Sequence, residues 1–143
     1  MPVKAKIGDR TTIWHPSLVN IYGCVIGEDC SIGCFVEIGP DVIIGNRCRI
    51  QSKVFIPTGI TIEDDVFIGP GATFLNDKHP PSKGAWKAMK TLVCKGVAIG
   101  GGALILPGIT LGKNCLIGAG AVVTKDVKEN ETVIGVPARC LTS

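Results

Sequence analysis

An aliphatic residue returns every six positions along most of the chain, and this short period constrains the fold more than any other feature. The residues that keep the period are Ile26, Ile32, Ile38, Ile44, Ile50, Ile56, Ile62, Ile68 and Phe74, and then Val93, Ile99, Ile105, Leu111, Ile117 and Val123. An earlier register holds Ile7, Ile13 and Val19. The fourth residue after each of these is small or β-branched, as at Ser17, Cys30 and Val36. Two inward positions in every six-residue unit predict a parallel β-helix rather than a helix bundle or an ordinary sheet.

Each six-residue unit is expected to form one face of the helix and to end in a tight corner. Glycine often follows the aliphatic residue, as at Gly27, Gly45 and Gly100, and glycine tolerates the backbone angles that a corner needs. Three faces make one triangular coil of about eighteen residues. The repeats therefore predict an all-β parallel β-helix of about six coils.

The period breaks twice. Val19 and Ile26 are seven residues apart instead of six, an excess that a bulged corner would absorb. Phe74 and Val93 are nineteen residues apart, and residues 75–91 between them contain two consecutive prolines and no repeat. Because long loops in a compact domain are usually functional, we expect this segment to leave the helix wall as a loop that carries part of a site.

The length of 143 residues predicts one domain, residues 1–143, that ends in a tail over residues 128–143. The first residues do not form a signal peptide, and no apolar run is long enough to cross a bilayer. A cytoplasmic protein without a membrane span is therefore expected.

The seven cysteines do not predict a metal site. Cys30, Cys48 and Cys115 occupy inward positions of the repeat, so they are expected to be buried, reduced thiols. The other cysteines lack the paired spacing of a zinc site, and the chain has only two histidines. No metal is expected.

Positive charge is concentrated in the second half of the chain. Residues 1–77 carry six Lys or Arg against nine Asp or Glu, whereas residues 78–143 carry nine against three, so the net charges are −3 and +6. The basic half begins at the predicted loop, which suits either a site for phosphate groups or a loop kept soluble by its charge. Low aromatic content and the lack of a recognisable binding module argue against nucleic acid as a partner.

The closing segments of the repeat resemble those of hexapeptide-repeat acyltransferases. They read Ile-Gly-Gly-Gly over residues 99–102, Ala-Gly-Ala-Val-Val-Thr-Lys-Asp-Val over residues 119–127, and Gly-Val-Pro-Ala-Arg over residues 135–139. Together with the repeats, the resemblance covers nearly the whole chain. It implies a left-handed β-helix that assembles as a homotrimer, with acetyl-CoA as cosubstrate in the clefts between subunits.

By the same resemblance, cofactor-binding residues are expected on the last coils. Gly101 and Ala119 are eighteen residues apart and should stack on adjacent coils, where small side chains let the pantetheine arm approach the backbone. Thr124 and Lys125 then fall beside the phosphate and adenine end, and Arg139 is a further candidate for phosphate contact. The alternative is that the glycines only turn corners and that Lys125 is solvated.

The segment around the start of the loop resembles a narrower group, the N-acetyltransferases of nucleotide-linked 3-amino sugars. It reads Glu-Asp-Asp-Val-Phe-Ile-Gly-Pro over residues 63–70, followed by Asn-Asp-Lys-His-Pro over residues 76–80. In that group the asparagine that matches Asn76 lies against the sugar amine and the thioester, where its amide orients the nucleophile. Asp77 and Lys78 are expected to contact the same substrate.

His79 is the second catalytic candidate. An imidazole suits a general base near neutral pH, and other hexapeptide-repeat acetyltransferases use a loop histidine. An amino sugar is already partly neutral near pH 7, however, and does not require a base. Three roles therefore stay open for His79: a general base, a contact to the substrate, or a residue without a part in the reaction. Trp86 of the same loop is expected to pack the loop onto a prism or to stack on a nucleobase.

These features predict an acetyl-CoA-dependent N-acetyltransferase that acts on a UDP- or dTDP-linked amino sugar in surface polysaccharide or lipopolysaccharide assembly. Two alternatives stay open. One is an O-acetyltransferase on a sugar or serine hydroxyl, which would need His79 because a hydroxyl must lose its proton during attack. The other is a non-enzymatic β-helix scaffold, which would not bind acetyl-CoA.

Overall fold

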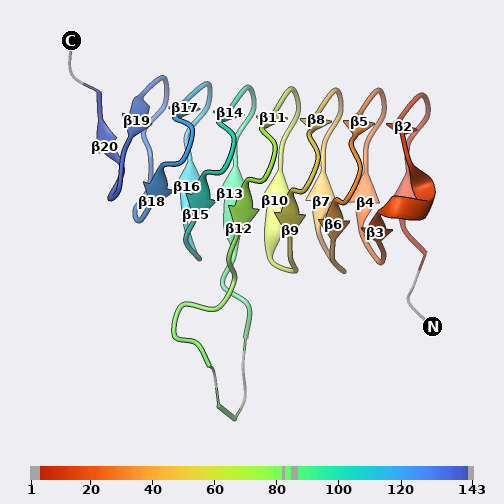
Figure 1. The fold of residues 1–143 in the computed structure, drawn as a ribbon, viewed down its shortest axis with the longest axis horizontal. Coiled ribbons are helices and arrows are strands. Elements are labelled where there is room, and N and C mark those ends of the chain that lie inside the picture. The colour runs from red at the N-terminus through yellow and green to blue at the C-terminus, as the bar shows by residue number, and fades with distance from the viewer. Residues whose placement is uncertain (1–3, 82, 85–86, 142–143) are drawn as a thin grey trace.

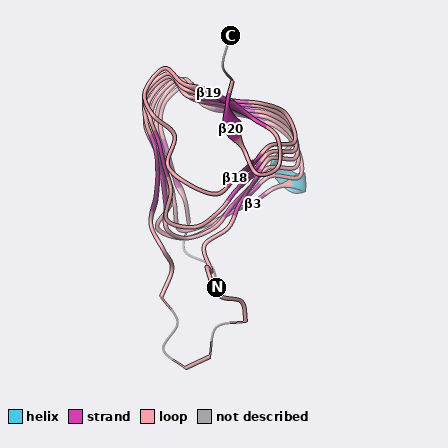
Figure 2. Cartoon of the chain, turned by 90° about the vertical axis from the view of Figure 1, so that its left-hand side faces the viewer, coloured by secondary structure: helices cyan, strands magenta, loops and turns pink. Residues whose placement is uncertain are grey.

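The computed structural model describes residues 4–81, 83–84 and 87–141, which wind into a parallel β-helix of short strands. Figure 1 shows the coils side by side along the long axis, and Figure 2 looks along that axis and shows them superposed around a common interior. The helix η1 (Pro16–Leu18) is a short 3-10 turn, and no helix in this part of the chain is long and apolar enough to cross a membrane. The predicted fold class, an all-β parallel β-helix, is confirmed.

The strands form three sheets, which we call A, B and C. Sheet A contains β1 (Lys6–Ile7), β4 (Val25–Ile26), β7 (Ile43–Ile44), β10 (Ile60–Ile62), β13 (Thr91–Val93) and β16 (Thr110–Leu111). Sheet B contains β2 (Thr12–Ile13), β5 (Ser31–Ile32), β8 (Arg49–Ile50), β11 (Phe67–Ile68), β14 (Ala98–Ile99), β17 (Leu116–Ile117), β19 (Thr132–Ile134) and β20 (Arg139–Cys140). Sheet C contains β3 (Asn20–Ile21), β6 (Glu37–Ile38), β9 (Phe55–Ile56), β12 (Thr73–Phe74), β15 (Leu104–Ile105) and β18 (Val122–Val123). The chain runs from A to B to C and back, so each coil has an A–B, a B–C and a C–A corner.

The aliphatic residue of each repeat points into the helix and forms the core. From Ile26 to Val123, every predicted inward aliphatic residue is at most 2% exposed. Strands one coil apart pair eighteen residues apart, as Ile26 does with Ile44. Burial of one such side chain contributes roughly 2 kcal/mol, so this column of residues holds the coils in register.

The first coil departs from the predicted register. Ile21, not Val19, is the sheet C residue that pairs with Ile38, because η1 is inserted between β2 and β3. Pro16 favours this insertion, since its fixed φ suits the first turn of a helix. Ser17, which was predicted to face inward, is exposed in η1. The extra residues of the first break therefore lie before β3, and the predicted bulge after Val19 is wrong.

The C-terminal segment extends the helix from the predicted six coils to about seven. β19 pairs in parallel with β17, and the chain then reverses so that β20 pairs antiparallel with β19. Val133 and Ala138 are buried in this segment. Part of the stretch 128–143, expected as a tail, therefore covers the end of the core.

The loop leaves the helix at the C–A corner between β12 and β13 and projects away from the sheets (Figure 1). The sequence placed it at residues 75–91, but Thr91 already begins β13 and is only 2% exposed. The loop itself therefore covers residues 75–90. Trp86, with its expected packing or stacking role, lies outside the described residues.

Candidate active-site groove

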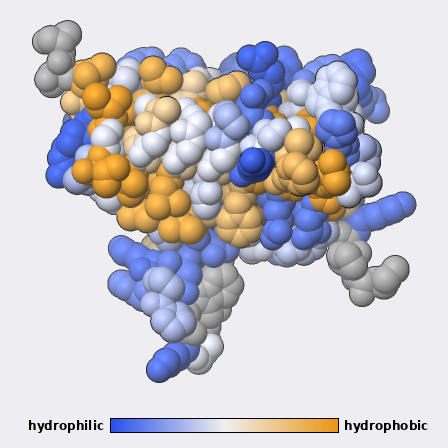
Figure 3. Space-filling view, viewed as in Figure 1, coloured by the Kyte–Doolittle hydropathy of each residue, from blue (hydrophilic) through white to orange (hydrophobic). Residues whose placement is uncertain are grey.

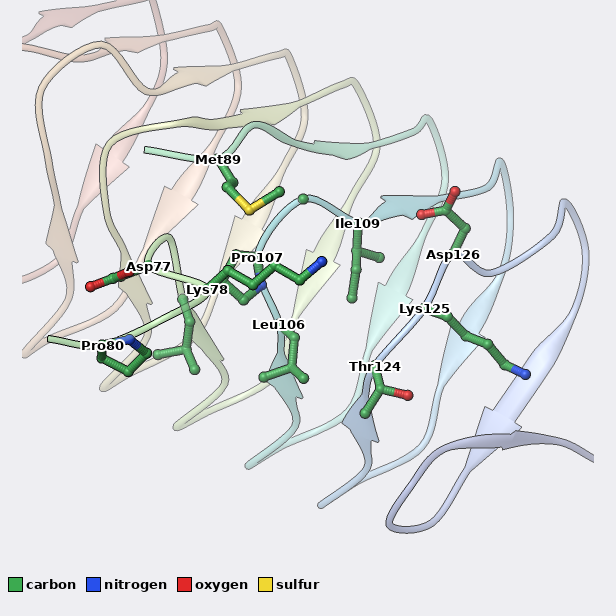
Figure 4. Close-up of a pocket in the computed structure, with 12 residues that line it drawn as sticks. Asp77, Lys78, Pro80, Met89, Leu106, Pro107, Ile109, Thr124, Lys125 and Asp126 are labelled. Carbon is green, nitrogen blue, oxygen red and sulfur yellow. The ribbon is translucent and has the colours of Figure 1, made fainter. Parts of the chain in front are cut away.

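A groove of about 630 Å³ lies at the C–A corner, between the base of the loop and the last coils (Figure 4). We call it the loop groove. It is lined by Leu75, Asp77, Lys78, Pro80, Met89, Leu106, Pro107, Gly108, Ile109, Thr124, Lys125 and Asp126. The repeat explains why distant residues meet here, because Leu106 and Thr124 are eighteen residues apart and occupy the same corner of adjacent coils. The carboxylate of Asp126 accepts a hydrogen bond from the Thr110 N–H at 2.8 Å, which ties this corner to the coil before it.

Several predicted site residues meet in the loop groove. Asp77 and Lys78 come from the loop, and Thr124 and Lys125 come from the last C–A corner. Arg139 lines an adjoining groove of about 500 Å³ that shares Thr124 and Lys125 with the first. One chain thus places the predicted substrate residues of the loop beside the predicted phosphate-binding residues of the last coils.

Asn76 stands at the neck of the loop, and its side chain is fixed by the preceding coil. Its Nδ2 donates a hydrogen bond to the backbone carbonyl of Thr58, eighteen residues earlier, at 2.8 Å. Its own carbonyl accepts a hydrogen bond from the N–H of Met89 at 3.2 Å, which joins the two ends of the loop. The contact with Thr58 fixes which end of the amide faces the helix wall. Asn76 is only partly exposed and lies directly before the groove residue Asp77.

His79 is on the exposed part of the loop and does not line the loop groove. Its backbone N–H donates a hydrogen bond to the Asp77 carboxylate at 3.1 Å, which stabilises the turn that carries the loop away from its neck. In a single chain, therefore, the structure separates the two catalytic candidates. Asn76 is held at the base of the loop and His79 is directed outward.

Gly101 and Ala119 lie at the B–C corner, not at the C–A corner of the loop groove. They stack on adjacent coils as predicted, since the N–H of Gly120 donates to the carbonyl of Gly101 at 2.9 Å. Ala119 and Thr124 are separated by one face of the prism, a span of at most about 17 Å for an extended chain. One chain does not bring the two halves of the predicted cofactor site into the same groove.

Two backbone N–H groups on either side of Gly101 at the B–C corner are engaged in hydrogen bonds of the helix. The N–H groups of Gly100 and Gly102 donate to the carbonyls of Ile117 and Pro70. These two groups are therefore not available as donors to an oxyanion. A side chain at Gly101 would place its Cβ 3.2 Å from the carbonyl oxygen of Pro70, so tight stacking between coils also favours glycine there.

The sequence analysis did not identify the apolar wall of the loop groove. Leu75, Leu106 and Pro107 come from the C–A corners, and Met89 comes from the returning end of the loop. Figure 3 shows that the described part of the loop is largely hydrophilic, whereas apolar residues gather on the prism beside its base. A signal was present in the sequence, because Leu75 and Leu106 occupy the position after the inward residue, which glycine fills in about half of the repeats, as at Gly100.

Charged residues of the A–B corner form a separate column of ion pairs. Arg10 contacts Asp29 at 2.7 Å, and Arg47 contacts Asp65 at 2.8 Å. Hydrogen bonds from these guanidinium groups hold the pKa values of Asp29 and Asp65 below their usual range. Each pair joins adjacent coils. Asp65 therefore serves to join adjacent coils through its ion pair, and it lies at a different corner from the loop groove.

The predicted burial of three cysteines is confirmed. Cys30, Cys48 and Cys115 are at most 2% exposed, and Cys24 is buried as well. Burial raises the pKa of the Cys115 thiol to about 11, so this thiol stays protonated at neutral pH. The described residues contain no group of three or more His, Cys, Asp or Glu side chains that would hold a metal ion.

Comparison with known proteins now identifies the family. A profile described as bacterial transferase hexapeptide, with six repeats, matches residues 23–58 and 90–125, just over half of the chain. The chain belongs to the bacterial transferase hexapeptide family. The matched stretches of this hexapeptide transferase flank its loop, of which residues 75–89 are unmatched. No curated protein sequence matches the chain significantly.

Solved structures of several acyltransferases share the fold of this transferase. A mutant of AntD, an N-acyltransferase from Bacillus cereus in complex with dTDP and coenzyme A, has a TM-score of 0.82 at 20% identity, covering all of this chain and 84% of its own. The acetyltransferase domain of PglB from Neisseria gonorrhoeae, in complex with acetyl-CoA, has a TM-score of 0.65 at 19% identity, covering 99% and 59%. The hexapeptide-repeat acetyltransferase VCA0836 from Vibrio cholerae, complexed with acetyl-CoA, has a TM-score of 0.59 at 26% identity, covering 96% and 70%. The predicted enzyme class and cosubstrate agree with what these structures contain.

Proposed function

We propose that the protein is a cytoplasmic, acetyl-CoA-dependent N-acetyltransferase that acts on the amino group of a nucleotide-linked amino sugar in surface polysaccharide assembly. The observation that carries this proposal is the loop groove, where Asp77 and Lys78 of the loop meet Thr124 and Lys125 of the last coils. Lysines beside an open groove suit the phosphates of coenzyme A and of a nucleotide sugar. VCA0836, which holds acetyl-CoA, and AntD, which holds coenzyme A together with dTDP, support the choice of ligands.

In the proposed reaction, the amine nitrogen attacks the thioester carbon, a C–N bond forms and the C–S bond breaks. The proton lost by nitrogen neutralises the departing thiolate of coenzyme A. Because Nδ2 of Asn76 donates to Thr58, we assign its Oδ1 the role of accepting a hydrogen bond from the amine. This contact would point the nitrogen lone pair at the thioester, and orientation of this kind is a large part of catalysis in two-substrate reactions.

The complete site is proposed to need two subunits of a homotrimer. The loop groove and the Gly101–Ala119 stack lie at different corners of one chain. In a trimer of parallel prisms, the loop corner of one subunit would face another corner of its neighbour. The pantetheine arm would then pass the stacked small residues of one chain and reach Asn76 of the other.

An amine acceptor fits the position of His79 better than a hydroxyl acceptor does. A hydroxyl must lose its proton during attack and needs a base within hydrogen-bond reach. Within one chain, His79 is exposed and outside the loop groove, whereas Asn76 is fixed beside it. The neutral fraction of an amino sugar requires only orientation, which Asn76 supplies.

The test is to measure release of coenzyme A from acetyl-CoA against a panel of UDP- and dTDP-linked amino sugars and the matching hydroxy sugars. The proposal expects turnover with at least one amino sugar and none with its hydroxy counterpart. Turnover only with hydroxy sugars would favour the O-acetyltransferase. A chain whose melting temperature is unchanged by millimolar acetyl-CoA would instead be a scaffold, because a ligand that binds the native state must stabilise it.

A further inference from the structure

The loop groove has an apolar wall at the base of the loop. Leu75, Leu106 and Pro107 line it from adjacent C–A corners, and Met89 lines it from the loop. Leu75 and Leu106 are partly exposed, and the residue Met89 is 36% exposed. The sulfur-containing chain of Met89 is drawn toward Ile109 in Figure 4, above the other apolar residues. This wall offers apolar surface to a ligand that carries an aliphatic part.

The end of the Met89 side chain occupies space next to a glycine. The terminal methyl group of Met89 lies 2.7 Å from the position that a Cβ of Gly108 would take. Gly108 also has a φ of +77°, a backbone conformation that side chains disfavour. The absence of a side chain at Gly108 therefore makes the space in which Met89 rests. Methionine is flexible and fills irregular spaces, so it suits an adjustable wall of a binding site.

Met89 is also the backbone partner of Asn76. The N–H of Met89 donates to the carbonyl of Asn76 at 3.2 Å, so the two residues are adjacent across the loop neck. An acyl carbon held at Asn76 for transfer would have its alkyl tail beside Met89 and Leu106. The positions of the two residues thus link the site of transfer to the apolar wall.

From these contacts we propose that Met89 is a specificity-determining residue that limits the length of the acyl chain accepted from acyl-CoA. This inference rests on the proposed function of the loop groove. The apolar wall accommodates the carbons beyond the thioester carbonyl, and the Met89 side chain closes the far part of that space. Shortening Met89 opens it to longer chains.

The test compares acetyl-CoA with hexanoyl-CoA in the wild type and in Met89→Ala, with an amino sugar that the wild type acetylates as the acceptor. A small hydrophobic pocket discriminates by about tenfold or more for each misfitting methylene, so Met89→Ala should raise the hexanoyl-to-acetyl ratio of kcat/KM at least about tenfold. Met89→Leu, which keeps the volume, should leave this ratio near the wild-type value. Leu18→Ala is the matched control, because Leu18 is a similarly exposed apolar residue of η1, far from the groove.

Thermal shift with each acyl-CoA gives a second readout that needs no acceptor, and Leu106→Ala gives a second variant if Met89→Ala does not fold. Met89→Ala and Leu106→Ala should each show a larger stabilisation by hexanoyl-CoA, relative to acetyl-CoA, than the wild type does. If the variants fold, use acetyl-CoA and keep the wild-type ratio within threefold, the inference is wrong while the proposed function stands. If the wild type neither binds nor uses any acyl-CoA, the proposed function fails and the inference with it.

Discussion

Replacing Asn76 by alanine separates a structural role of this residue from a catalytic one. Its Nδ2 donates one neutral hydrogen bond to Thr58 in the preceding coil at 2.8 Å. Loss of such a bond destabilises a protein by about 1 kcal/mol. For 143 residues, the average entropy of unfolding converts this loss into a fall in melting temperature of about 3 °C.

The expected loss of activity in Asn76→Ala is much larger than this loss of stability. If Oδ1 orients the amine, its removal should lower kcat/KM about a hundredfold, which corresponds to about 2.7 kcal/mol of transition-state stabilisation. Steady-state kinetics with the amino-sugar acceptor measure this value. The assay temperature must lie well below the melting temperature of the variant, so that folded enzyme is compared with folded enzyme.

Asn46→Ala provides the matched control. The Asn46 Oδ1 accepts a hydrogen bond from the N–H of Glu28, also eighteen residues earlier, at 2.9 Å. This contact is at an A–B corner, away from the loop groove. Asn46→Ala should therefore lower the melting temperature by a similar amount and leave kcat/KM within about threefold of wild type. Equal losses of activity in the two variants, or a kcat/KM above a third of wild type in Asn76→Ala, would refute the catalytic role.

Three further predictions follow from the same geometry. His79→Asn should retain most activity with an amino sugar at all pH values, and a collapse of activity at all pH values would favour a general base at His79 or a hydroxyl acceptor. Lys125→Ala should raise the KM for acetyl-CoA about tenfold at low salt and less at 0.5 M salt, because added ions screen the lost contact; an unchanged KM would place the phosphates elsewhere. The pKa of Asp65 is lowered by Arg47, so this pair stabilises the fold above the ordinary pKa of the carboxyl and the contribution is lost as pH falls through the lowered value. Asp65→Asn should therefore flatten the dependence of melting temperature on pH in the acid range, and an unaltered dependence would show that the pair contributes nothing.

The core of the central coils was predictable because the residues that recur every six positions are also the ones that the structure buries. An inward position such as Ile68 recurs every six residues only if each face has the same length, so the column could be identified directly. The first coil could not be, because Val19 and Ile21 are both aliphatic and the period does not reveal where an insertion lies. Only the strand pairing of Ile21 with Ile38 decides between them.

The candidate site was predictable in composition but only partly in arrangement. The resemblance identified Asn76 and Lys125. The structure places Lys125 in the loop groove together with Asp77, the residue that follows Asn76. The unbroken period from Val93 to Val123 also implies that Thr124 lies one corner beyond Ala119, a separation that the resemblance alone did not reveal. The sequence could not show that Met89 returns to contact Gly108, because that contact depends on the path of the loop.

The most direct test of the account is a crystal structure of the protein with acetyl-CoA bound. We predict a trimer in which the thioester lies beside Asn76 of one subunit, with the phosphates near Thr124 and Lys125 and the pantetheine arm along the Gly101 and Ala119 corner of its neighbour. Acetyl-CoA bound away from the loop groove, or bound wholly within a monomer, would contradict the account.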